Sequence, residues 1–199
     1  MIRAVYFDMG GVLLRSESKA GRQKWERRLG LMDGALEPIV FENRVAALAT
    51  VGRASTEAVW AEVGRLLALG DGQLAELADD FFAGDAFDVD LLSFLRSLRP
   101  RYKTGLISNA WPTARASTRQ CLNATVFDLI LFSAEEGVQK PDPEIYHRAL
   151  QRLGVAPHEA VFVDDVLDNV EGACAVGMRG LQFFNSAQAR AAIEALLNG

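Results

Sequence analysis

Short apolar runs alternate with helical patterns over most of the chain. Runs rich in β-branched and aromatic residues, each stopped by turn-forming or polar residues, predict strands at residues 2–7, 102–107, 129–132, 160–163 and 180–184. Apolar positions at helical spacing predict helices between them, at residues 90–98, 113–121, 143–153 and 169–176. Strands that alternate with helices form parallel sheets through right-handed crossovers. The expected fold class is therefore α/β, with a doubly wound parallel sheet covered by helices on both faces.

The stretch at residues 15–87 breaks this alternation. It shows helical patterns at residues 19–29, 36–50, 55–68 and 71–82, and no convincing strand. Glycines and aspartates stand at the expected helix ends. We predict a core domain made of residues 1–14 and 88–199, with residues 15–87 inserted after the first strand as a helical unit. A separate helical domain is less favoured because fewer than ~80 residues would need a core of their own.

Composition and charge narrow the classes of function. The 199 residues are 50% hydrophobic and 24% charged, with a net charge of −5, as in ordinary globular proteins. An acidic balance disfavours a nucleic-acid partner, because such proteins carry basic surfaces for phosphates. The two cysteines form no disulfide framework, and no apolar run approaches the ~20 residues of a membrane span. We expect a cytoplasmic protein with reduced thiols and no membrane partner; the oligomeric state stays open.

Polar residues follow three of the predicted strands. Asp8 ends the first, the pair Ser108 and Asn109 ends the second along the chain, and Asp164 with Asp165 ends the run at 160–163. Ligands bind open parallel sheets beyond the carboxyl ends of the strands. These residues are therefore expected to meet in one site, although more than 150 positions separate the first from the last.

The residue types in this predicted site suit phosphoryl chemistry. Asp8 precedes two glycines, Gly10 and Gly11, where backbone N–H groups can face a bound anion. A carboxylate at that place can attack phosphorus and form an aspartyl phosphate. The negative phosphate repels the carboxylate, so a divalent cation and a basic side chain are needed.

The chain contains candidates for the ligands of a divalent cation and for the basic side chain. Asp164 and Asp165 supply the one or two carboxylates that Mg²⁺ usually takes from a protein. Lys140 stands in a loop set by two prolines and can bring a positive charge to the site. The hydroxyl of Ser108 and the amide of Asn109 can contact phosphate oxygens.

These segments together resemble the haloacid dehalogenase-like (HAD) hydrolase superfamily. The resemblance is to its subfamily IA, in which a helical cap is inserted after the first strand of a Rossmann-like core. The resemblance covers nearly the whole chain, and four motifs in the right order make it specific. They are Phe7-Asp8-Met9-Gly10-Gly11-Val12, Leu106-Ile107-Ser108-Asn109, Lys140-Pro141-Asp142-Pro143, and Val161-Phe162-Val163-Asp164-Asp165 followed by residues 168–173.

The resemblance implies a role for each matching residue. Asp8 would be the nucleophile, and Lys140 would neutralise charge and contact the phosphate. The other implied phosphate contacts are Ser108, Asn109 and Gly11; the implied Mg²⁺ ligands are Asp8, the carbonyl of Gly10, Asp165 as the main acid of the fourth motif, and Asp164 assisting.

Gly10 departs from the family's commonest pattern. Phosphatases of the family usually have a second aspartate there, which protonates the leaving group and then activates water. Glycine keeps the carbonyl but has no acid. We expect phosphoryl transfer to be slow, restricted to good leaving groups, or assisted by a substrate hydroxyl or another residue, such as Glu17.

Three functions follow from these observations. The favoured one is a Mg²⁺-dependent phosphomonoesterase acting on a small phosphorylated metabolite, with sugar phosphates implied by the resemblance. The second is hydrolytic dehalogenation of a 2-haloacid, which Gly10 allows but the paired Asp164 and Asp165 disfavour. The third is a catalytically weak phosphate-binding protein that keeps the hydrolase fold.

Aromatic and basic side chains of the insertion have structural interpretations. Trp25, Trp60 and the phenylalanines at helical spacing are expected to pack in the cap and core. Trp111 is assigned no role. The basic residues Arg22, Lys24, Arg27 and Arg28 are expected on the solvent face of a cap helix, where they could attract an anionic substrate.

Overall fold

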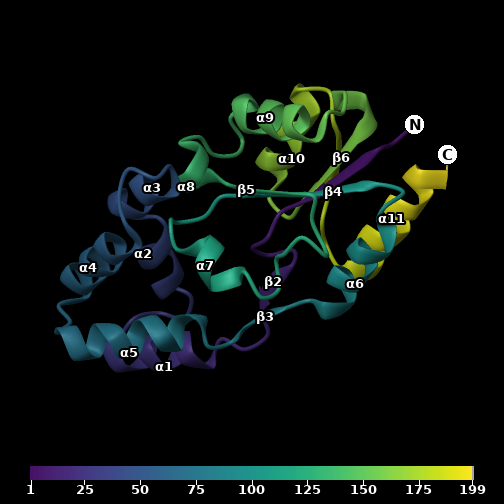
Figure 1. The fold of residues 1–199 in the computed structure, drawn as a ribbon. Coiled ribbons are helices and arrows are strands. Elements are labelled where there is room, and N and C mark those ends of the chain that lie inside the picture. The colour runs from purple at the N-terminus through teal and green to yellow at the C-terminus, as the bar shows by residue number, and fades with distance from the viewer. Residues whose placement is uncertain (199) are drawn as a thin grey trace.

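The computed structural model describes residues 1–198, which contain one five-stranded sheet. Its strands are β1 (Ala4–Phe7), β4 (Lys103–Ser108), β5 (Leu129–Phe132), β6 (Ala160–Asp164) and β7 (Arg179–Gln182), in the order β5-β4-β1-β6-β7. Every neighbouring pair is parallel (Figure 1). The predicted α/β fold with a parallel sheet is confirmed, and each strand overlaps its predicted range.

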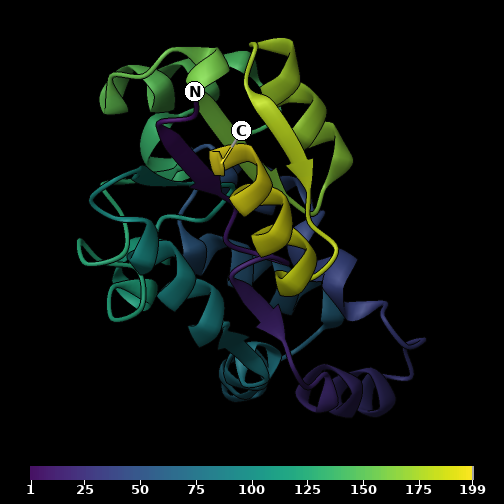
Figure 2. The same cartoon turned by 90° about the vertical axis from the view of Figure 1, so that its right-hand side faces the viewer.

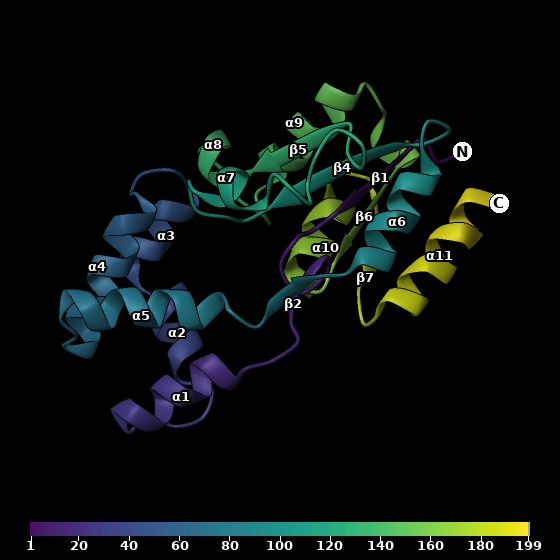
Figure 3. The ribbon, with the colours of Figure 1, turned by 60° about the horizontal axis from the view of Figure 1, so that its bottom comes forward.

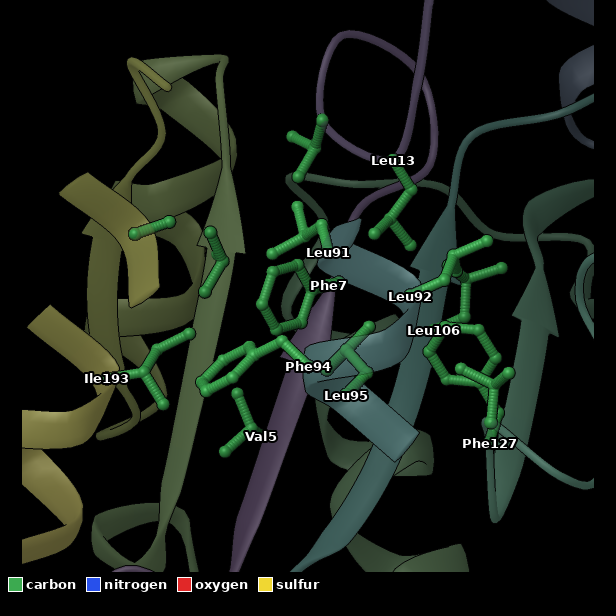
Figure 4. Packing of buried hydrophobic residues seen from close by; sticks show 14 of the residues in the cluster. Val5, Phe7, Leu13, Leu91, Leu92, Phe94, Leu95, Leu106, Phe127 and Ile193 are labelled. Atoms are coloured by element: carbon green, nitrogen blue, oxygen red, sulfur yellow. The ribbon is translucent and has the colours of Figure 1, made fainter. Parts of the chain in front are cut away.

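Helices cover both faces of this sheet (Figure 1). The face with α6 (Val89–Leu98) and α11 (Ser186–Asn198) takes Val5 and Phe7 of β1 into its apolar core (Figure 4). The face with α9 (Pro143–Leu153) and α10 (Leu167–Ala175) takes Ala4 and Tyr6. Successive residues of a strand point to opposite faces of the sheet, and both faces of β1 are buried. Helix α11 was not predicted from the sequence.

A small hairpin-like ladder joins the helical insertion to the sheet domain. Strands β2 (Leu14–Ser16) and β3 (Asp85–Phe87) pair antiparallel at the two ends of the insertion. The expectation that residues 15–87 hold no strand is therefore wrong. Each strand has only three residues and its partner lies at the far end of the insertion, so neither leaves a local pattern.

Helices α1 to α5 stand between these two strands, at the end of the molecule opposite Met1 (Figure 3). Their bounds are α1 (Ala20–Leu29), α2 (Leu36–Phe41), α3 (Arg44–Thr50), α4 (Thr56–Leu67) and α5 (Asp71–Phe82). The predicted helix at 36–50 is two helices, because Asn43 turns the chain and its side chain accepts a hydrogen bond from Ala46 N–H as the N-cap of α3.

The insertion has an apolar core of its own, made by Trp25, Leu36, Val40, Val63, Leu77 and Phe81. The basic residues of α1 are mostly engaged in ion pairs. Lys24 and Arg28 pair with Glu76 on α5. The prediction of a solvent-facing position is wrong for Arg22, which is 8% exposed because Glu37 and Asp85 bind its guanidinium.

The rest of the chain adds short elements: α7 (Ala114–Thr118), which ends earlier than predicted, α8 (Ser133–Glu136) and the 3₁₀ turn η1 (Pro157–Glu159). The amino terminus and the end of α11 lie near each other, away from the insertion (Figures 1 and 2). Both cysteines are free thiols. In residues 1–198 we find no helix with the length and apolarity to cross a bilayer.

Candidate active site

The sheet register places Asp8 at the carboxyl edge, between two strands that carry other polar residues. Phe7 pairs with Leu106 of β4 on one side and with Val163 of β6 on the other. The Asp8 N–H donates to the Val163 carbonyl at 2.8 Å, which extends the β1–β6 ladder by one residue. Ser108, the last residue of β4, therefore lies on one side of Asp8, and the Asp164 and Asp165 pair lies on the other.

Lys140 connects the acids of this edge. Its Nζ lies 2.7 Å from Asp8 Oδ1 and 2.6 Å from Asp164 Oδ2, and all three side chains are buried. Burial raises the pKa of Asp8 to about 6, while the Lys140 ammonium opposes this shift and the Asp164 carboxylate adds to it. The lysine thus stabilises the ionised form of Asp8, which is the form able to act as a nucleophile.

Asp164 is held from several directions. Besides Lys140, it accepts hydrogen bonds from the Val166 N–H at 2.9 Å and from the Asn169 amide at 3.1 and 3.2 Å. This carboxylate therefore fixes the position of the Lys140 ammonium. Sequence reasoning gave Asn169 no role, although it lies in the segment that follows the fourth motif; its spacing from Asp164 is the signal that could have identified it.

The side chain of Asn109 binds the backbone of Lys140. Its Nδ2 donates to the Lys140 carbonyl at 2.9 Å, and its Oδ1 accepts from the Lys140 N–H at 2.8 Å. This two-point contact ties the end of β4 to the loop that carries the lysine. The side-chain amide of Asn109 is thus engaged with protein backbone, and Ser108 beside it is 1% exposed.

The two glycines after Asp8 have different surroundings. Gly11 has a φ of +72°, and a Cβ there would lie 2.1 Å from Asp165 Oδ2, so only glycine lets Asp165 approach. Its N–H donates to the Leu14 carbonyl at 3.0 Å. A Cβ at Gly10 would meet nothing within 4 Å. The position of the missing second aspartate is therefore open space.

The acids at this edge form a set suited to a hard cation. Asp8, Asp164 and Asp165 each offer a carboxylate oxygen, and these oxygens lie within 4.8 Å of one another. Within residues 1–198, Asp8 Oδ1 is buried without a hydrogen bond of good geometry, although Lys140 lies beside it. Burial, and next the Asp164 carboxylate, raise the pKa of Asp165. Clustered carboxylates with an unsatisfied oxygen fit Mg²⁺, which prefers oxygen ligands.

The chain matches the family model of haloacid dehalogenase-like hydrolases over residues 2–177. It belongs to this hydrolase family, which makes it an enzyme of the class that the four motifs predicted.

Three curated proteins illustrate its relatives. Sesquiterpene phosphatase astK of Aspergillus oryzae is 28% identical over 92% of this chain and 91% of its own length. Phosphatase MT3486 of Mycobacterium tuberculosis is 30% identical over 95% of this chain and 90% of its own. Acyl-CoA dehydrogenase family member 10 of Mus musculus is 26% identical over 98% of this chain, which spans only 19% of that longer protein.

Solved structures share the fold. A predicted HAD-like hydrolase from Porphyromonas gingivalis superposes with a TM-score of 0.78 at 24% identity, over 100% of this chain and 99% of its own. A HAD family enzyme from Bacteroides thetaiotaomicron, in complex with magnesium and inorganic phosphate, has a TM-score of 0.75 at 17% identity, over 92% and 94%. L-2-haloacid dehalogenase from Xanthobacter autotrophicus has a TM-score of 0.62 at 25% identity, over 98% and 83%.

Proposed function

We propose that this chain is a Mg²⁺-dependent phosphomonoesterase of small phosphorylated metabolites that acts through an aspartyl phosphate on Asp8. The observation that carries the proposal is the buried contact between Asp8 and Lys140 at the end of β1, beside the Asp164 and Asp165 carboxylates. The phosphatases among the relatives support the same reaction class.

Asp8 begins the reaction as a nucleophile. A carboxylate oxygen attacks phosphorus, the bond between phosphorus and the ester oxygen breaks, and the alcohol leaves after taking up a proton. Lys140, 2.7 Å from Asp8, offsets negative charge as the phosphate approaches. Asp164 assists by holding the ammonium in place.

The acids offer a cation site next to the nucleophile. Asp8, Asp165 and the main-chain carbonyl of Gly10, with Asp164 behind them, would hold Mg²⁺, which supplies positive charge that neutralises the phosphate oxygens. Asp165 suits this role because it is exposed beside the buried acids and its carboxylate lies close to Gly11, where the absent Cβ leaves it room.

The phosphate contacts would come from the end of β4, the lysine loop and the loop after β1. Ser108 and Lys140 would bind phosphate oxygens through their side chains. Asn109 would contribute its main chain, because Lys140 already engages its side-chain amide. Gly11 would lie beside the phosphate, because the lack of a side chain keeps the loop after β1 close to Asp165.

Hydrolysis of the aspartyl phosphate completes the cycle. Water attacks phosphorus, the bond to Asp8 breaks, and inorganic phosphate leaves with Asp8 restored. Gly10 provides no acid for the first step and no base for the second, so esters with good leaving groups are expected to turn over fastest. Residues 15–87 would act as the cap that excludes bulk water from the site during phosphoryl transfer and selects the leaving group.

The test is phosphate release from a panel of phosphomonoesters with Mg²⁺ and with EDTA. Wild type should release phosphate only with the metal, and Asp8→Asn should abolish release while keeping the fold by circular dichroism. A matched control is Asp142→Asn, which removes an exposed carboxylate from the Lys140 loop. Equal activity of wild type and Asp8→Asn would exclude the mechanism, and inactivity of wild type on every ester would favour a phosphate-binding protein.

Dehalogenation is the second candidate, favoured by the structural similarity to a haloacid dehalogenase and by Gly10. In that reaction an Asp8 oxygen would displace halide from carbon, and water would then hydrolyse the ester. Halide release from 2-chloropropionate that persists in EDTA would establish this reaction in place of phosphate release.

A further inference from the structure

Five aromatic side chains connect the insertion to the loop after β4. This aromatic cluster consists of Phe41, Trp60, Phe81, Phe82 and Trp111. The Phe41 ring lies 5.4 Å from that of Phe81, 6.4 Å from that of Phe82 and 5.5 Å from that of Trp111. Trp60 closes the group, 6.1 Å from Phe82. Trp111, which belongs to the sheet domain, thus packs against helices of the insertion.

The aromatic cluster begins close to the proposed phosphate site. Trp111 follows Ser108 by three residues, so their Cα atoms are at most about 11 Å apart. Ser108 ends the strand beside Asp8. Trp111 therefore links the aromatic cluster to the strand end that flanks Asp8.

Two members of the aromatic cluster present apolar surface to solvent. Phe41 is 47% exposed and Phe82 is 41% exposed, whereas Phe81 between them is buried. The ring contacts agree with the predicted packing role of these phenylalanines, but Phe41 and Phe82 also leave part of their surface exposed. Val166 and Leu167, directly after Asp165, are also exposed and apolar. Exposed apolar groups that lie together, as Phe41 and Phe82 do, often mark binding surfaces.

The guanidinium that lies over a ring of the aromatic cluster is already neutralised by carboxylates. The Arg22 guanidinium stacks 4.4 Å from the centroid of the Phe81 ring and pairs with Glu37 and Asp85. Lys19 pairs with Glu37 as well. Ring faces and paired charges suit a hydrocarbon group, while the hydroxyls of a polyol would lose hydrogen bonds to water there.

We propose that the aromatic cluster, through Phe41, Phe82 and Trp111, binds the apolar organic group of the substrate, so that the preferred esters are phosphates of hydrocarbon-rich alcohols. This assignment rests on the proposed phosphatase function and names its substrate class. It differs from the sugar phosphates that the family resemblance implied.

The experiment compares kcat/KM for ethyl, butyl, hexyl and octyl phosphate, all below micellar concentrations. Their leaving groups are chemically alike, so the series varies only apolar length. Each methylene that becomes buried raises kcat/KM about fourfold. For wild type, kcat/KM should be at least tenfold higher with octyl phosphate than with ethyl phosphate. Divided by the number of carbon atoms, kcat/KM should also be higher with both of these esters than with glycerol phosphate.

Phe41→Ala, Phe82→Ala and the double variant test the residues. The octyl-to-ethyl ratio should fall severalfold in each single variant and approach one in the double variant. Leu66→Ala is the matched control: Leu66 is on α4, is as exposed as Phe41 at 47%, and lies outside the aromatic cluster. Its ratio should equal that of wild type.

The outcomes separate this proposal from the phosphatase function. Phosphate release that is independent of chain length, or a ratio unchanged in the double variant, overturns the apolar subsite alone. If no ester is hydrolysed, the phosphatase function fails, and calorimetric binding of octylphosphonate against ethylphosphonate decides the subsite: equal affinities overturn it. A dimer that the double variant dissociates, with the ratio unchanged, would assign the surface to a second copy and overturn the proposal.

Discussion

The Lys140 ammonium binds the buried carboxylates of Asp8 and Asp164 but not that of Asp165. The neighbouring acids Asp164 and Asp165 therefore have different surroundings. Asp164 is fully buried and binds Lys140 and Asn169, while Asp165 next to it is exposed and lies close to Gly11. We therefore expect substitutions of these two adjacent aspartates to have different effects.

Replacing each acid by asparagine separates these roles. Asp165→Asn should raise the Mg²⁺ concentration for half-maximal activity about tenfold or more, with unchanged stability. Asp164→Asn should lower the free energy of unfolding by about 3–5 kcal/mol, because it removes one partner of a buried ion pair. Urea denaturation and Mg²⁺ titration measure the two effects. Asp168→Asn, exposed in the first turn of α10, is the control; equal effects at 164 and 165 would contradict the assignment.

Gly10 and Gly11 form a second contrasting pair. Gly10→Asp places a carboxyl in open space and should raise turnover of alkyl phosphates by up to ~10²-fold, with a smaller gain for aryl phosphates, which need less protonation. Steady-state kinetics on both esters measures this. The same leaving-group dependence in both enzymes would show that a missing acid does not limit the reaction. Gly11→Ala should instead inactivate, since its Cβ would collide with Asp165.

Asp88 shows how one residue secures the element at the boundary of the insertion. Its carboxylate caps α6 by accepting from the Leu91 N–H at 2.8 Å, and it pairs with Arg15 at 2.7 Å and accepts from Ser186 on α11. Partial burial alone would raise the pKa of Asp88, but the hydrogen bonds from Ser186 and Leu91 and the Arg15 charge lower it below its ordinary value.

Loss of this carboxylate should weaken the junction of β2, α6 and α11. Asp88→Ala should cost about 1–2 kcal/mol of stability at neutral pH. Since the folded-state pKa is lowered, the carboxylate stabilises the fold above the unfolded-state pKa of about 3.9, and this contribution is lost as the pH falls through the folded-state pKa. Denaturation at pH 7 and pH 3 checks both statements. Asp90→Ala, exposed in the same helix, should be near neutral at both pH values.

At the scale of the whole molecule, α3 of the insertion is tied to the sheet domain at Ser133. This buried hydroxyl at the start of α8 donates to the Thr50 carbonyl at 2.6 Å and accepts from the Ala110 N–H at 2.9 Å. Nearby, a Cβ at Gly52 would lie 2.1 Å from the Ala134 carbonyl, so the two backbones are in close contact. The insertion is thus attached to the core both at the β2–β3 ladder and at α8.

Removing the hydroxyl should loosen the second attachment. Ser133→Ala should lower the free energy of unfolding by about 1–3 kcal/mol and increase amide hydrogen exchange in α3 and at residues 109–113, because a buried N–H and a partly buried carbonyl lose their partner. Ser117→Ala, whose exposed hydroxyl bonds only within its own helix, is the control. Exchange that rises uniformly over the whole chain would contradict a local attachment.

Local sequence patterns were sufficient to predict the sheet and the edge of it at which the acids meet. The strand-forming runs and the turn residues that stop them are local signals, so Asp8, Ser108 and Asp164 were identifiable as strand ends, and parallel topology then brings strand ends together. The four motifs added Lys140, whose distance from Asp8 no periodicity reveals.

The different contacts of these side chains became visible only in the folded structure. The clamp of Asn109 on the Lys140 backbone, the pairing of β2 with β3 and the exposure of Phe41 beside a buried Phe81 all depend on contacts between segments distant in sequence. Hydrophobicity marks a phenylalanine as apolar, but its neighbours in space decide whether it fills a core or stays available for a substrate.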